Sequence, residues 1–131
     1  MKKHRLLNQP LSATIAGLGH LDELVIADAG LPIPDGPQRI DLALSPGIPS
    51  FLACLETVLD EMAVERAVIA EEMPEVSPAL HQQLLKVLGD IPVEMLAHSD
   101  FKKRTASVAA VVRSGEFTAY ANVILIAGVV F

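Results

Sequence analysis

The sequence GHLDELVIADAGLPIPDG (residues 19–36) contains a short apolar strand pattern that ends directly at an acid. The strand pattern covers Leu24–Ala27, Asp28 follows it, and a loop rich in proline and glycine comes next. Ligands of α/β proteins bind at the carboxyl ends of the strands. An acid in this place, followed by a stiff loop, is therefore a candidate part of a binding site. His20, which lies just before the strand, is a second candidate.

Strand and helix patterns alternate along the rest of the chain. Apolar residues at helical spacing, together with Ser caps and Gly stops, predict helices at residues 7–18, 50–62, 78–88 and 99–103. Ser77 and Pro78 are a strong helix start, with the serine as the cap. Short apolar runs predict strands at residues 24–27, 40–44, 66–70, 93–97, 109–112 and 123–131. The alternation predicts one α/β domain over residues 1–131, with a mostly parallel sheet and helices on both faces.

The composition limits the possible partners. The 131 residues are 51% hydrophobic and carry a net charge of −6, which disfavours binding to nucleic acid or to an anionic membrane. The mean hydropathy of +0.43 is high, yet no apolar run approaches the roughly 18 residues that a membrane span needs. We therefore expect subunit interfaces to cover the excess apolar surface.

The cysteine content and the N-terminal sequence bear on the compartment. A single cysteine, Cys54, excludes an internal disulfide, and its helical apolar pattern predicts a buried structural thiol. The first 20 residues do not resemble a signal peptide. We expect the protein in the cytoplasm.

Two of the four histidines stand out. His98 follows a predicted strand and would share the carboxyl edge with Asp28, whereas His4 and His81 are expected to be solvent-exposed. Asp28 has a purely structural alternative, in which its carboxylate caps the following turn. A phosphoacceptor role for Asp28 is disfavoured because the last strand lacks a lysine. A zinc site is also disfavoured, since no compact pair of ligands exists.

The polar run GEFTAYAN (residues 115–122) links two apolar strands and contains the only tyrosine, Tyr120. Its hydroxyl and the amide of Asn122 suit a ligand that carries many hydroxyl groups. The alternative is a polar loop with a packed tyrosine.

Taken together, these segments resemble the ribose/fucose mutarotase family over nearly the whole chain. The resemblance rests on Gly19-His20, on residues 25–36, 40–42, 101–102 and 112–122, and on the closing residues 127–131. The chain departs from the common family pattern at Ser114, where threonine is usual, and at Ala119, where proline is usual.

The resemblance implies an isomerase that interconverts the pyranose and furanose forms of D-ribose through the open-chain aldehyde. It implies that His20 is catalytic and that Asp28, His98, Tyr120, Ala121 and Asn122 bind the sugar. It also implies a ring-shaped homo-oligomer, typically a decamer of two stacked pentamers. Proton transfer alone requires no metal and no cofactor. A mutarotase for another sugar such as L-fucose and a non-catalytic sugar-binding protein are the alternatives.

Overall fold

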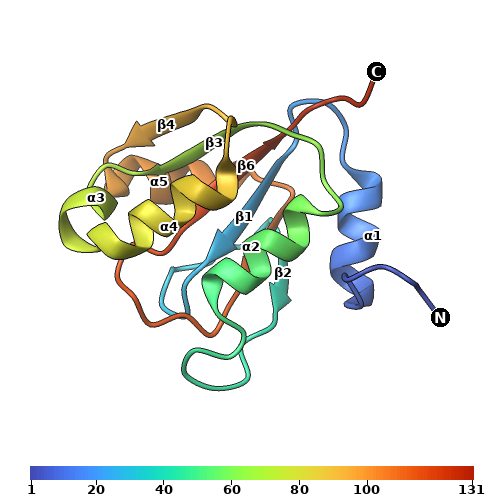
Figure 1. Ribbon diagram of the computed structural model, residues 1–131, viewed down its shortest axis with the longest axis horizontal. Coiled ribbons are helices and arrows are strands. Elements are labelled where there is room, and N and C mark those ends of the chain that lie inside the picture. The colour runs from blue at the N-terminus through green and yellow to red at the C-terminus, as the bar shows by residue number, and fades with distance from the viewer.

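The six strands of the computed structural model, which describes residues 1–131, form one sheet in the order β2-β5-β1-β6-β3-β4 (Figure 1). Along the chain the elements are α1 (Gln9–Gly17), β1 (Glu23–Ala27), β2 (Gln38–Asp41), α2 (Phe51–Leu59), β3 (Val64–Ala70), α3 (Met73–Val76), α4 (Pro78–Leu88), β4 (Val93–Leu96), α5 (His98–Arg104), a 3₁₀ turn (Thr105–Ser107), β5 (Ala110–Arg113) and β6 (Val123–Ala127). The predicted α/β class is confirmed, and the predicted elements occur in the predicted order, with α3 and the 3₁₀ turn as elements that the sequence analysis missed. None of the helices combines the length and the apolar character that crossing a membrane requires.

The sheet is mixed, because β6 runs antiparallel to both of its neighbours, β1 and β3. The other five strands are parallel to one another. The connection from β5 to β6 covers only residues 114–122, which is shorter than the dozen or so residues that a crossover to a parallel strand needs. The reversal brings residues 114–122 to the carboxyl edge of the parallel strands, beside Asp28.

Side chains from alternate positions of the buried strands form two cores, one on each face of the sheet. In β1, Leu24 and Ile26 join the larger core, and Val25 and Ala27 join the smaller one. The apolar residues of α1, α2 and α4 cover the larger core, and α5 contributes Phe101 to the smaller one. Figure 1 shows α2 and α4 in front of the sheet and α5 behind it. The predicted placement of helices on both faces is therefore correct.

The chain end differs from the prediction. The expected strand at residues 123–131 ends at Ala127, and Gly128 leaves the sheet with its N–H bonded to the carbonyl of Ala63. Val130 and Phe131 are 88% and 102% exposed. The last two residues of the apolar tail therefore lie in solvent, and in Figure 1 the tail ends beside the segment that enters β1.

Candidate functional site

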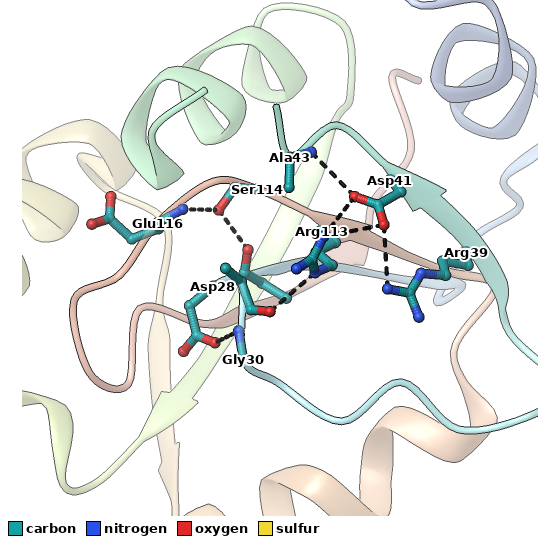
Figure 2. Close-up of polar contacts among 10 residues, drawn as sticks. Asp28, Gly30, Arg39, Asp41, Ala43, Arg113, Ser114 and Glu116 are labelled. Carbon is teal, nitrogen blue, oxygen red and sulfur yellow. Dashed lines mark hydrogen bonds and ion pairs between the residues drawn. The ribbon is translucent and has the colours of Figure 1, made fainter. Parts of the chain in front are cut away.

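Asp28 and Asn122 form a reciprocal pair at the carboxyl edge of the sheet. The backbone N–H of Asp28 donates to Asn122 Oδ1 over 2.9 Å, and Asn122 Nδ2 donates to Asp28 Oδ2 over 2.7 Å. Asn122 is 1% exposed, so the pair fixes the carboxylate against a buried amide. The other carboxylate oxygen accepts the N–H of Gly30 over 2.8 Å (Figure 2). The Asp28 carboxylate therefore caps the turn after β1, and its role toward a ligand stays a prediction.

Side chains of the loop between β5 and β6 form hydrogen bonds to β1 and α2. The buried Ser114 donates through Oγ to the carbonyl of Ala27 over 2.6 Å and accepts the N–H of Glu116 (Figure 2). The Glu116 carboxylate accepts the N–H of Phe51, the first residue of α2, together with donors from Phe117 and Thr118. Ser114 retains the hydroxyl that the family threonine would supply, so this departure preserves the contact.

The pKa of Glu116 reflects these contacts. Partial burial raises the pKa of its carboxyl, but the Thr118 hydroxyl and the N–H groups of Phe51, Thr118 and Phe117 outweigh burial. The pKa therefore lies below its ordinary value of 4.5, and the carboxylate is charged at neutral pH.

A pocket of about 360 Å³ opens beside Asp28. Its lining comes from the turn after β1 and from the loop between β5 and β6: Asp28, Ala29, Gly30, Arg113, Glu116, Phe117, Thr118 and Ala119. Arg113 is held in this wall because its Nε donates to the carbonyl of Ala29 and its Nη1 pairs with Asp41 at 3.1 Å (Figure 2). Sequence reasoning did not single out Arg113 or Asp41, and only the parallel pairing of β2 with β5 aligns them.

His98 and Tyr120 form a second group at the same edge. Their rings meet edge to face, with centroids 4.9 Å apart. The backbone N–H of His98 donates to both carboxylate oxygens of Glu72, at 3.1 and 3.0 Å. The ring Nδ1 of His98 is buried and has no hydrogen-bond partner. Of the predicted residues only Asp28 lines the pocket. Tyr120 contacts His98, whereas Asn122 is bonded to Asp28. Ala121 is fully buried, so its side chain faces the core.

His20 lies at the opposite end of the strands. It precedes β1, and its Nε2 lies 2.9 Å from Oε2 of Glu65, near the start of β3. The side chain of His20 is 51% exposed and borders a separate hollow whose wall includes the tail residues Val129, Val130 and Phe131. Within one chain the structure does not bring His20 to the other predicted residues.

The predictions for the cysteine and for one of the two remaining histidines are correct. Cys54 is buried, as predicted. His4 is exposed, as predicted. The expectation of an exposed His81 is wrong, because the residue is half-buried and its Nε2 is buried without a partner. No three His, Cys, Asp or Glu side chains gather in a way that could hold a metal ion.

The chain matches known proteins over its full length or nearly so. The model of the RbsD / FucU transport protein family matches residues 1–130. A D-ribose pyranase of Symbiobacterium thermophilum is 55% identical over 131 residues, which covers 100% of both chains.

Two solved structures extend the comparison. Bacillus subtilis RbsD, solved in complex with D-ribose, is 46% identical and superposes with a TM-score of 0.96, covering 100% of each chain. The fucose mutarotase of Streptococcus pneumoniae, solved with L-fucose, is 25% identical with a TM-score of 0.77 and the same coverage.

Proposed function

Because the chain belongs to the RbsD / FucU family, we propose that it is an isomerase that interconverts the pyranose and furanose forms of D-ribose. One observation carries the choice of sugar: a D-ribose pyranase is 55% identical over the whole chain, whereas the fucose mutarotase is 25% identical. The pocket beside Asp28, with its acids and amide nearby, suits a small neutral ligand rich in hydroxyl groups. A cytoplasmic location stays a prediction.

The reaction consists of proton transfers through the open-chain aldehyde. A base removes the proton from the hydroxyl on C1, an acid protonates the ring oxygen O5, and the C1–O5 bond breaks. The hydroxyl on C4 then attacks C1, gives up its proton and closes the five-membered ring, while the aldehyde oxygen takes a proton back. An ordinary histidine titrates at about pH 6.5, so both of its forms are available near neutrality. A positioned acid or base of this kind contributes roughly 10²–10⁴-fold.

We assign the proton transfer to His20. The Glu65 carboxylate at 2.9 Å from Nε2 orients its ring, and half of the side chain stays open to a ligand. A carboxylate on one ring nitrogen fixes the tautomer and leaves the other nitrogen for the sugar.

His20 and Asp28 lie too far apart along β1 to act on one sugar within a single chain. The five residues of β1 lie between His20 and Asp28, and at about 3.3 Å per residue they separate the two ends by roughly 16 Å. A pentose cannot touch both ends. We infer that His20 of one subunit serves the Asp28 edge of a neighbour.

The same geometry supports a ring. A contact in which each subunit offers one edge and receives the other is head-to-tail, and such contacts close into rings when the rotation allows. The exposed tail beside His20 supplies apolar surface for it. The number of ten subunits, as two pentamers, rests on the family resemblance alone.

The substrate contacts are assigned from the carboxyl edge. Asp28 accepts hydrogen bonds from sugar hydroxyls, and the hydroxyl of Tyr120, which makes no hydrogen bond within the chain, offers a donor and an acceptor. Asn122 acts mainly by holding Asp28, and Ala121 contributes only through its backbone. His98 borders the sugar beside Tyr120.

Magnetisation exchange between the ring forms of ribose tests the proposal. We expect the protein to accelerate exchange between the pyranose and furanose signals of D-ribose far more than exchange among L-fucose signals, and His20→Ala to abolish it. Ribose binding without faster exchange would support the sugar-binding alternative. Faster exchange for L-fucose alone would assign the other sugar.

A further inference from the structure

Ser77 does not do what its position in the sequence predicts. It precedes α4 at the place of the N-cap, yet its side chain makes no cap hydrogen bond. Its Oγ instead donates over 2.7 Å to the carbonyl of Ala119, 42 residues away. Ser77 is 8% exposed. A residue that gives up a favourable local cap for a buried distant contact indicates a requirement at the distant end.

The distant end is a tight turn with unusual backbone geometry. The N–H of Ala121 bonds to the carbonyl of Thr118 over 3.3 Å, so residues 118–121 form a turn with Tyr120 in its third position. Tyr120 has φ of 61°, the sign that a type II turn requires there and that glycine or asparagine normally supplies. A bulky side chain in this region is strained and persists only when its surroundings hold it.

The carbonyl that Ser77 binds decides which turn forms. Type I and type II turns differ in the orientation of their central peptide, which here joins Ala119 to Tyr120. Turning the Ala119 carbonyl away from Ser77 gives the type I form and carries φ of Tyr120 to negative values. The hydrogen bond from Ser77 therefore opposes the change that would relieve the strain.

The type II form places the Tyr120 ring edge-on against His98 at 4.9 Å. We propose that Ser77 is a positioning residue for sugar binding, which holds the Ala119–Tyr120 peptide so that Tyr120 stays against His98. The inference rests on the proposed function, because it takes Tyr120 as a sugar contact. It assigns to Ser77 no contact with the sugar.

The chain offers a direct readout, since Tyr120 is its only tyrosine and it has no tryptophan. Protein with ring-labelled tyrosine gives a single set of aromatic NMR signals, whose shifts report the neighbouring His98 ring. The variants are Ser77→Ala, Ser77→Thr, which keeps the hydroxyl, and Ser107→Ala as the control. Ser107 Oγ donates to the carbonyl of Arg104 over 3.0 Å, away from the turn.

We expect Ser77→Ala to move the Tyr120 signals toward those of free tyrosine. Loss of one positioning hydrogen bond should raise the KM for D-ribose about two- to tenfold, with kcat within about twofold of the parent because no proton-transfer group changes. Ser77→Thr should keep the parent signals and KM, and Ser107→Ala should change neither.

Unchanged Tyr120 signals and KM in folded Ser77→Ala would overturn the proposal. So would a lower melting temperature with KM unchanged, because that result assigns Ser77 a structural role only. If the parent protein showed no ring-form exchange, the proposed function would be wrong, and the Tyr120 signals would still decide whether Ser77 holds the turn.

Discussion

The two edges of the sheet are built differently. At the carboxyl edge, Asp28, Ser114, Glu116 and Asn122 bind one another's backbone or side chains, and Ser114 and Asn122 are fully buried. At the amino edge, His20 has one carboxylate partner and is half exposed, beside a tail that ends in solvent. The side chains at the carboxyl edge are held by contacts within the chain, whereas at the amino edge His20 and the apolar tail stay largely exposed.

Substitution of one glycine at each edge should show the largest difference. A Cβ on Gly115 would lie 2.5 Å from the carbonyl oxygen of Ile48 and 2.6 Å from that of Ser45, whereas a Cβ on Gly128 would meet the Glu65 side chain at 3.2 Å. We expect Gly115→Ala to lower the free energy of unfolding by about 3 kcal/mol or more, because backbone must move. Gly128→Ala should cost about 1 kcal/mol or less. Urea unfolding measures both, and equal losses would contradict the difference in packing.

Removal of the tail should break assembly without breaking the chain's fold. Deleting Val129–Phe131 removes exposed apolar side chains and no core residue. We expect sedimentation to show smaller species, and we expect ring-form exchange to fall with assembly because the proposed site takes residues from two subunits. A truncated protein that keeps its oligomeric state and its activity would show that neither assembly nor the site depends on the tail.

Acid should weaken the carboxyl edge through Glu116. Its folded-state pKa lies below 4.5, so the charged carboxylate stabilises the fold above about pH 4.5, and this contribution is lost as the pH falls through the folded-state pKa. We expect Glu116→Gln to be less stable than the parent at pH 7, with the difference shrinking below pH 4.5. Unfolding curves from pH 7 to pH 3 test this, and a difference independent of pH would contradict it.

The smallest effect concerns Cys54, which lies on α2. Burial, with a further contribution from the Glu116 charge, raises the pKa of its thiol to about 11. At pH 8 only about 0.1% is then thiolate, the reactive form. We expect slow reaction with a thiol reagent in the folded protein and fast reaction in urea. Fast labelling of the folded protein would show that α2 opens readily.

The sequence predicted the parts of the fold that follow from local pattern. The acid after β1, the Ser50 cap of α2 and the Gly89 stop of α4 are all present. The direction of β6 was not predictable from its apolar pattern, which is the same for either direction, and only the short connection of residues 114–122 indicated it. The end of β6 at Ala127 depends on the contact of Gly128 with Ala63 and Glu65, which is distant in sequence.

The candidate site was predictable in part for the same reason. Asp28 and Asn122 were chosen by type and position, and the structure pairs them. Arg113 was missed because it becomes a wall of the pocket only through the alignment of β5 with β2, where it meets Asp41. Ser77 was expected as a cap, and only the tertiary fold brings it to Ala119.

The most direct test of a site shared between subunits is complementation between two inactive variants. His20→Ala removes the proposed proton-transfer group from the amino edge, and Asp28→Asn removes the carboxylate from the carboxyl edge. Each variant alone should show almost no exchange between ribose ring forms. In mixed oligomers, random pairing gives about a quarter of the interfaces an intact His20 from one subunit and an intact Asp28 from its neighbour. We predict that co-assembled variants recover exchange to about that fraction of the parent rate. Mixed oligomers as inactive as the separate variants would place His20 and Asp28 in the same chain's site and contradict the account.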